Sequence, residues 1–416
     1  MSATDRVPPT PAGEAVALAR RLDLPLAVLF GLGVTIGAGI YVLIGATAGR
    51  AGMHAPLAFL LAALVMAPTA ASFAELAGRM PVSAGEAAYV KVGFRSEALA
   101  LVVGCMVIAT GVISAAAISR GSAGYIAELV ELPAAIIVPA VVLAMGAVAA
   151  WGILQSVALA GLLTLIEVGG LLAIIAVGAA RSPELVTRIP EIWTGLGDAA
   201  VVAGILSASL LAFFAFIGFE GLANIAEEVK QPEKNLPLAI FLTLGLSTLL
   251  YMLVLWIALV SVPRAELATS RAPLGLVFQR VTGASPTVIV AIAIVATING
   301  IIVQMVMASR VVFGLADRHL LPALLARINR MTQTPLEATA LVIAAVLLLA
   351  VALPLEGLAE WTSRLTLAVF AFVNAALGCL KWRGEAPPAG AYVTSRWVPW
   401  AGLILCLALL VSDLAG

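Results

Sequence analysis

Residues 31–45, GLGVTIGAGIYVLIG, lie inside a long apolar run and contain five glycines. Glycines in a membrane helix most often allow close packing against a neighbouring helix. Here, however, Gly37, Ala38 and Gly39 bring three small residues together at mid-span, where a helix can unwind at low steric cost. Freed N–H groups at the start of the second half-helix would suit a carboxylate. The stretch therefore either packs helices tightly or forms a backbone site inside the membrane.

The composition of the whole chain indicates that this run lies in a membrane. Of the 416 residues, 62% are apolar and only 11% are charged, whereas a soluble domain carries about 25% charged residues. A soluble fold of this length could not cover so much apolar surface. The lipid bilayer is the expected partner, and the net charge of zero gives no indication of a nucleic-acid partner.

Apolar runs recur along the chain, and a membrane span needs about 20 mainly apolar residues. We predict eleven spans, at residues 24–48, 54–79, 97–127, 133–150, 155–180, 200–226, 236–261, 286–314, 336–354, 358–380 and 397–413. Most of the 23 Lys and Arg residues then share the side of the N-terminus, which the positive-inside bias places in the cytoplasm. The prediction is an all-α, multi-pass protein of the cell inner (cytoplasmic) membrane, with residues 1–23 as a cytoplasmic tail.

The sixth predicted span is interrupted like the first. Within SASLLAFFAFIGFEGLANIAEEVKQPEKNLP, residues 207–237, two glycines flank Glu220. An ionisable residue inside a membrane is by default a functional candidate, although a structural carboxylate bonded to a neighbouring helix is the alternative. The phenylalanines of this segment either pack or roof a pocket: Phe213, Phe214, Phe216 and Phe219. Paired interrupted spans at corresponding positions of two halves indicate an inverted-repeat transporter with a site at mid-membrane.

Glu167 is a further candidate, because it lies mid-span in LLTLIEVGGLLAII with no basic residue within one helical turn. Burial there favours a neutral acid that exchanges protons, unless Glu167 is only a packing residue. Asn299 and Gln304 either hydrogen-bond across helices or face the solute, and Asn299 with Ser309 is a candidate polar side of the pocket. Glu75 falls near a cytoplasmic span end, where a side chain reaching toward the interface is the simpler account.

No constellation of residues indicates catalysis, a metal site or a cofactor. His54 and His319 lie in or beside loops, and the chain has no HExxH, no GxSxG elbow and no Walker A loop. The cysteines are interpreted as packing residues, because none forms a CxxC pair: Cys105, Cys379 and Cys406. Secondary transport is the main prediction and a receptor or scaffold the remote alternative. A channel is disfavoured because the polar residues form no repeated filter motif.

Four segments together resemble the amino acid–polyamine–organocation (APC) transporter superfamily, whose fold is the LeuT-like five-plus-five inverted repeat. They are residues 31–45, PVSAGEAAYVKVGF at 81–94, FFAFIGFEGLANIAEEVKQPEKNLPLAI at 213–240, and ASRVVFGLADRHLLPALLARINRMTQTP at 308–335. The resemblance implies a first repeat over 24–180, a second over 200–380 and an additional helix at 397–413. Helices one and six would be discontinuous around the substrate.

The same resemblance implies roles for single residues in binding an amino acid. The α-carboxylate would meet amide groups of Gly37, Ala38 and Gly39, with Ile36 and Ile40 adjoining. The α-amino group would meet backbone carbonyls around three residues of the sixth helix, namely Phe213, Phe216 and Ile217. Phe214 matches a gating aromatic and Glu220 an acidic gating or coupling position.

Glu167 departs from the family pattern, because some proton-coupled relatives place a lysine in that register. An acid that binds a proton or a cation stands there instead, so we expect a symporter coupled to H⁺, with Na⁺ as the alternative ion and an amino acid exchanger as the alternative mechanism. The aromatic lining favours neutral apolar amino acids, while a cationic substrate paired with Glu220 is the other possibility. Many relatives carry twelve spans, one more than this chain.

Overall fold

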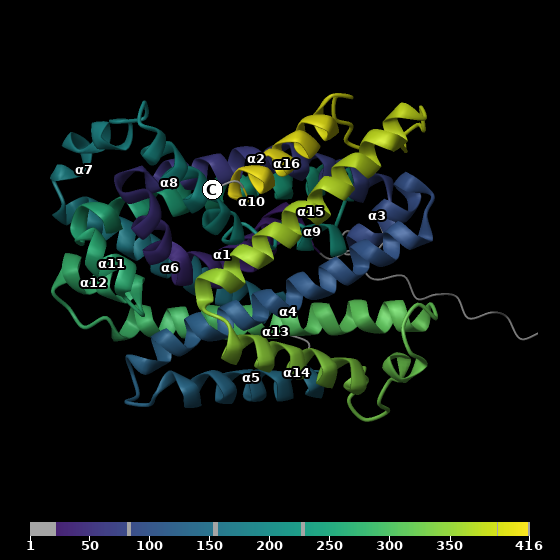
Figure 1. Cartoon of the computed structure of the whole chain (residues 1–416), viewed down its shortest axis with the longest axis horizontal. Coiled ribbons are helices and arrows are strands. Elements are labelled where there is room, and N and C mark those ends of the chain that lie inside the picture. The colour runs from purple at the N-terminus through teal and green to yellow at the C-terminus, as the bar shows by residue number, and fades with distance from the viewer. Residues whose placement is uncertain (1–21, 81–84, 153–156, 226–228, 389, 415–416) are drawn as a thin grey trace, which may run out of the picture.

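A computed structural model describes residues 22–80, 85–152, 157–225, 229–388 and 390–414, and these residues form a bundle of α-helices (Figure 1). The long helices are α1 (Leu24–Ala51), α2 (Ala55–Arg79), α4 (Glu97–Ala127), α5 (Ala134–Trp151), α6 (Val157–Arg181), α8 (Ala199–Phe214), α10 (Pro232–Ser261), α13 (Thr287–Asp317), α14 (Leu336–Ala352), α15 (Leu355–Trp382) and α16 (Val398–Leu414). The fold class predicted from the sequence is confirmed.

The predicted spans correspond to these helices. Seven helical stretches of the described residues are long and apolar enough to cross a bilayer, and the first of them, Leu24–Arg79, contains both α1 and α2. The shorter apolar helices α8, α14 and α16 account for the remaining three spans. Most of the predicted tail at 1–23, and residues 155–156 and 226 of two predicted spans, lie outside the described residues.

Side-chain caps define several of the helix starts. Asp23 accepts a hydrogen bond from the N–H of Leu26 at the start of α1, and Ser96 does the same for Leu99 at the start of α4. Such caps satisfy N–H groups that have no partner within the helix. Each cap therefore lies where a polar connection ends and an apolar span begins.

The long helices pack in two groups. One consists of α4, α5, α13 and α14, which lie side by side (Figure 1). The other consists of α1, α2, α8 and α10. Helix α6 packs on α1 and α10, while α15 packs on α4 and α16. The two interrupted helices, α1 and α8, thus belong to the same group, and α13 and α4 face them from the other.

Both predicted interruptions are present. In α1 the backbone leaves helical geometry at Gly37, with φ −7° and ψ −132°. Helix α8 ends at Phe214, a non-helical segment covers 215–220, and the short α9 (Gly221–Asn224) follows. The interruptions divide each helix into halves, and the inner halves are the ones on the predicted cytoplasmic side.

The inner halves of the two interrupted helices are joined by their backbones. The N–H of Lys230, just after α9, donates to the carbonyl of Leu22, just before α1, at 2.7 Å. Leu22 and Val229 form a short parallel β-bridge, and both side chains are buried. This bridge fixes the start of α1 to the chain that leaves α9.

Short helices lie where the sequence indicated only connections. They are α3 (Gly85–Phe94), α7 (Glu184–Thr187), α11 (Arg264–Thr269) and α12 (Pro273–Thr282), with 3₁₀ turns at Gly52–His54, Ile189–Ile192 and Ala323–Ala326. They are too short to span a bilayer, so a search for long apolar runs misses them. α3 follows the second span, whereas α11 and α12 follow the seventh. These are corresponding positions in two five-helix halves, although the repeat boundaries stay a prediction.

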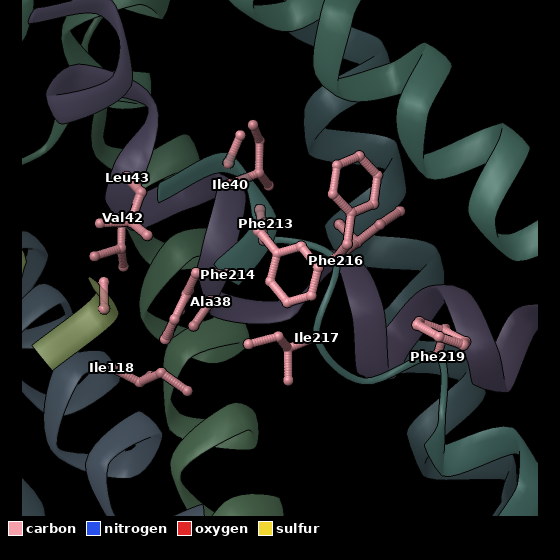
Figure 2. Close-up of a cluster of buried hydrophobic side chains, with 14 of the residues drawn as sticks. Ala38, Ile40, Val42, Leu43, Ile118, Phe213, Phe214, Phe216, Ile217 and Phe219 are labelled. Atoms are coloured by element: carbon pink, nitrogen blue, oxygen red, sulfur yellow. The ribbon is translucent and has the colours of Figure 1, made fainter. Parts of the chain in front are cut away.

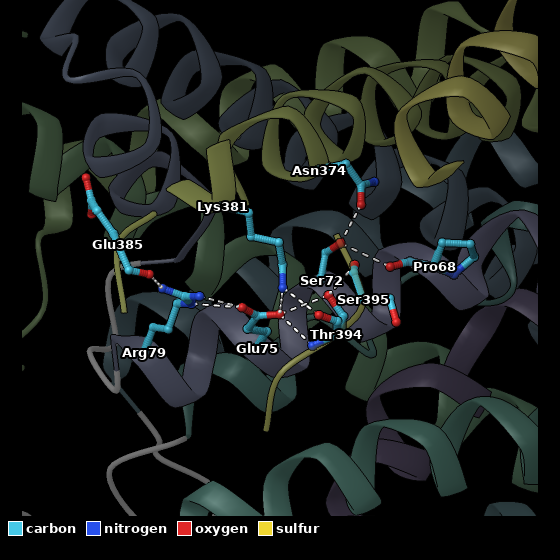
Figure 3. A network of polar contacts seen from close by, with 9 residues as sticks. All are labelled: Pro68, Ser72, Glu75, Arg79, Asn374, Lys381, Glu385, Thr394 and Ser395. Atoms are coloured by element: carbon cyan, nitrogen blue, oxygen red, sulfur yellow. Dashed lines mark hydrogen bonds and ion pairs between the residues drawn. The ribbon is translucent and has the colours of Figure 1, made fainter. Parts of the chain in front are cut away.

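The prediction that Glu75 extends toward the interface is wrong. Its side chain is fully buried, with Lys381 of α15 at 2.7 Å and Arg79 also at 2.7 Å. Thr394 donates its main-chain N–H and its hydroxyl to the same carboxylate, at 2.7 and 2.9 Å (Figure 3). We call Glu75, Arg79, Lys381 and Thr394 the buried ion cluster. It joins the ends of α2 and α15 to the segment that precedes α16.

Candidate functional site

A cavity of about 50 Å³ lies beside the two helix interruptions. It is lined by residues of α1, α4, α13 and the end of α8, namely Gly33, Val34, Thr35, Gly37, Ala38, Gly39, Ser114, Ile118, Phe214, Ile217, Asn299, Gly300, Val303 and Gln304. Both helix groups therefore contribute to its wall. Non-helical backbone within a membrane is tolerated where it lines such a cavity.

Glycines bring the two interruptions into direct backbone contact. A Cβ added at Gly39 would lie 2.5 Å from the Cα of Ala215, the first residue after α8. Gly218 has φ +129°, and a Cβ there would lie 2.6 Å from the carbonyl oxygen of Val34. Any larger residue at either position would push the helices apart. The glycines thus hold the two broken helices at the distance that forms the cavity.

Tyr251 of α10 ties the interruptions together from behind. Its hydroxyl lies 2.8 Å from the carbonyl oxygen of Thr35 and 2.9 Å from that of Ala215. Its ring packs against Phe59 and Phe216. Carbonyls that lose their helical partner at a break need another donor, and the single hydrogen of this hydroxyl is shared between one carbonyl from each broken helix.

Two backbone carbonyls at the second interruption stay open. The N–H groups of Ala215, Phe216 and Ile217 each donate to a carbonyl three residues earlier, which closes the last turn of α8. Within the described part of the chain, the carbonyls of Phe216 and Ile217 accept no hydrogen bond. A ligand ammonium group is a suitable partner for such carbonyls.

Six of the residues predicted for the site line the cavity: Gly37, Ala38, Gly39, Phe214, Ile217 and Asn299. Figure 2 shows Ala38, Phe214 and Ile217 close together, with Phe219 on the far side of the cluster. The other predicted residues of the two interrupted helices are fully buried but do not line it: Ile36, Ile40, Phe213 and Phe216. Their roles in binding stay predictions.

Glu220 does not line the cavity. Its carboxylate accepts a hydrogen bond of 2.8 Å from the N–H of Gly218, within the same interruption. The acid thereby satisfies a backbone donor that a continuous helix would have satisfied. This contact shapes the interruption, and a gating or coupling role for Glu220 stays a prediction.

Glu167 is fully buried in α6, and among the described residues neither oxygen of its carboxylate has a hydrogen-bond partner. Its main-chain carbonyl accepts a bond of 2.8 Å from the hydroxyl of Tyr41, in the second half of α1. One turn earlier in α6, the Thr164 hydroxyl would clash with a Cβ at Gly33, which lines the cavity. Glu167 thus lies behind the cavity wall on a helix that touches α1 on both sides of Gly37.

Ser309, the other predicted polar residue of the pocket, is not among the lining residues. It is buried, and its hydroxyl donates to the carbonyl of Val306 in its own helix. Gln304, for which the sequence left open a position facing the solute, lines the cavity, and two polar lining residues were not assigned to the site from the sequence: Thr35 and Ser114. Thr35 belongs to the glycine-rich stretch itself, whereas nothing in the sequence pointed to Ser114.

Residues 22–412 match the family model described as "Amino acid permease". The chain belongs to the amino acid permease family. This permease is 29% identical over 412 residues to the Branched-chain amino acid permease BcaP of Bacillus subtilis (strain 168). The aligned residues cover 95% of this chain and 88% of that protein. The family assignment agrees with the predicted membership of the APC superfamily, and it makes the chain a transporter.

Other relatives of the permease carry other substrate names. It is 30% identical to Cationic amino acid transporter 2, vacuolar, of Arabidopsis thaliana, over 88% of this chain and 60% of that one. It is 28% identical to the Methylthioribose transporter of Bacillus subtilis (strain 168), over 95% of this chain and 89% of that one. Three relatives at similar identity are thus named for three different solutes, so similarity alone does not select the substrate of this permease.

Proposed function

We propose that this permease moves an amino acid across the cytoplasmic membrane by alternating access, in symport with protons. The observation that carries the proposal is the cavity between two broken helices. One side presents the start of a half-helix at Gly37–Gly39, and the other presents Ile217, whose carbonyl accepts no hydrogen bond in the described part of the chain. An amino acid is a zwitterion, so its carboxylate can meet the half-helix and its ammonium group can meet the carbonyl on the opposite side.

The charges of the substrate have to be met by backbone. Among the described residues, none that lines the cavity carries an ionisable side chain. A carboxylate would be stabilised by the N–H groups and the positive end of the half-helix dipole. An ammonium group would donate to the free carbonyl of Ile217. Every amino acid has this carboxylate and ammonium group, and the protein backbone would bind both. The rest of the cavity would then contact the substrate side chain.

Glu167 supports proton coupling. It is an acid in an apolar helix, shut from water, and its carboxylate has no partner in the described part of the chain. A buried carboxylate without a counter-charge binds a proton readily. Tyr41 links its helix to the second half of α1, the half that begins at the binding site. We infer that protonation of Glu167 acts on α1 through this contact between the two helices.

The test is uptake of radiolabelled amino acids by the purified chain in proteoliposomes. We expect an inward pH gradient to drive accumulation, and Glu167→Gln to abolish the response to that gradient while slower exchange persists. The control is Glu184→Gln, which changes an exposed acid in the short helix α7. Uptake driven by a Na⁺ gradient but not by pH would overturn proton coupling. Uptake that requires internal amino acid would establish the exchanger instead.

The predicted orientation has a separate test. The positive-inside bias places the N-terminus, and hence the buried ion cluster, at the cytoplasmic side. A fluorescent reporter that folds only in the cytoplasm should be bright at the N-terminus and dark at the C-terminus. The reverse pattern would invert the orientation without affecting the proposal for the binding site.

A further inference from the structure

The size of the cavity restricts the substrate side chain. At about 50 Å³, the cavity has room for roughly three to five water-sized groups, at 10–15 Å³ each, and the charged groups of the substrate share this space with its side chain. Phe214, Ile118 and Val303 form bulky parts of its wall. Gly300 brings α13 close to the other walls, because a Cβ there would lie 3.5 Å from the Cβ of Ala38. A long or aromatic side chain would have to displace these residues.

The lining also excludes a charged side chain. The buried acids nearest the site are used elsewhere or set back from it, since Glu220 holds the N–H of Gly218 and Glu167 lies behind the wall. A charge placed in a membrane cavity without a counter-charge is strongly unfavourable. The cavity therefore favours a neutral side chain over a cationic one paired with Glu220.

Two residues that line this cavity carry unpaired polar atoms. Thr35 Oγ1 and Asn299 Oδ1 are both buried, both belong to lining residues, and neither has a hydrogen-bond partner among the described residues. Ser114, whose side chain is also buried, adds a third polar group from α4. Buried polar groups without partners are uncommon in folded proteins, and a role in binding a ligand is one explanation for them. Two such atoms, on α1 and α13, belong to residues that surround the position left for a side chain, and Ser114 adds a hydroxyl from α4.

We propose that the side-chain part of the site selects small neutral amino acids bearing a hydroxyl group, such as serine and threonine, and that Asn299 and Thr35 are the residues that read the hydroxyl. This inference rests on the proposed function, since it assumes that an amino acid occupies the cavity. A hydroxyl is both donor and acceptor, so it satisfies the amide oxygen of Asn299 and the hydroxyl of Thr35 together. An apolar side chain of equal size leaves both atoms unpaired.

A site built to hydrogen-bond a substrate hydroxyl discriminates strongly against analogues that lack it, whereas an apolar pocket discriminates weakly by size. We therefore expect kcat/KM for serine or threonine to exceed that for valine or leucine by at least about tenfold. Lysine and arginine are expected to compete poorly for uptake. Alanine should be an intermediate substrate, because it fits but leaves the polar atoms unpaired.

The experiment measures uptake of serine, threonine, alanine, valine, leucine and lysine by the full chain in proteoliposomes. Asn299→Leu should lower kcat/KM for serine by about tenfold and leave that for alanine nearly unchanged. Ser309→Ala is the matched control on the same helix, because its hydroxyl bonds only the carbonyl of Val306. Thr35→Val is a second variant, which provides the same comparison if Asn299→Leu does not fold.

The outcomes separate this inference from the proposed function. Uptake of leucine or lysine in preference to serine, or an Asn299→Leu variant with the wild-type ratio of serine to alanine, would overturn the inference alone. Absence of uptake, exchange and thermal stabilisation with every amino acid would overturn the proposed function. If both variants fail to fold, the substrate preference of the wild-type chain still decides the inference.

Discussion

The ammonium group of Lys381 lies 2.7 Å from the carboxylate of Glu75, and both side chains are almost completely removed from solvent. These two residues belong to helices α15 and α2, and the carboxylate also binds Arg79 and Thr394. A buried ion pair loses far more stability when one member is removed than a surface pair does. The buried ion cluster therefore connects the ends of these two helices through charged groups.

Removal of the acid should be the most damaging change in this cluster. Glu75→Ala leaves two buried cations without an anion, so we expect a loss of about 3–5 kcal/mol in the free energy of unfolding. Lys381→Met should cost less, because Arg79 still pairs with Glu75. Thermal unfolding in detergent provides the measurement. Lys91→Ala is the control, since it removes an exposed pair with Glu97 worth at most about 1 kcal/mol; equal losses in Lys91→Ala and Glu75→Ala would contradict the prediction.

Substitution of Gly218 should disturb the binding site itself. Its φ of +129° disfavours any other residue, and a Cβ would meet the carbonyl of Val34. We expect Gly218→Ala to destabilise the protein by about 1–3 kcal/mol and to reduce uptake at least about tenfold, since near-site displacements have large kinetic effects. Gly245→Ala is the control, because a Cβ at that position of α10 meets no atom within 4 Å. Wild-type uptake by Gly218→Ala would show that the two interruptions need not touch.

Tyr251→Phe tests the tie between the interruptions. The substitution keeps the ring contacts with Phe59 and Phe216 but removes the hydroxyl shared by Thr35 and Ala215. A lost hydrogen bond of this kind costs about 1 kcal/mol, so the variant should fold. We expect a lower apparent affinity for substrate, measured by thermal shift across a concentration series. An unchanged affinity would mean that the open backbone is held in place without this hydroxyl.

The ion pairs of Glu385, at the predicted cytoplasmic end, predict a small pH dependence of the stability of the protein. The guanidinium of Arg383, with a smaller contribution from Arg95, lowers the pKa of this exposed carboxyl below its ordinary value. A lowered folded-state pKa means that the stabilisation is present at neutral pH and is lost as pH falls through that value. The melting temperatures of wild type and Glu385→Gln should therefore converge at acid pH. A difference that grows on acidification would have the wrong sign.

The sequence was sufficient to predict the spans and both interruptions, because long apolar runs and clustered glycines are local signals. It also named Asn299 and Phe214, which line the cavity. It did not identify Ser114, since the face of α4 that meets the cavity depends on how α4 packs against α1 and α13. It misplaced Glu75 for the same reason: position within a span gives depth in the membrane, whereas the partners Lys381 and Thr394 come from the far end of the chain.

The backbone bridge between Leu22 and the chain after α9 has a consequence for how the site is exposed to one side of the membrane. If the inner half of α1 moved alone, it would break the hydrogen bond from Lys230 and expose two buried side chains. If both inner halves move together as one rigid unit, that contact stays intact. Removal of the chain up to and including Leu22 would then separate the inner half of α1 from α9, so that one could move while the other stayed in place.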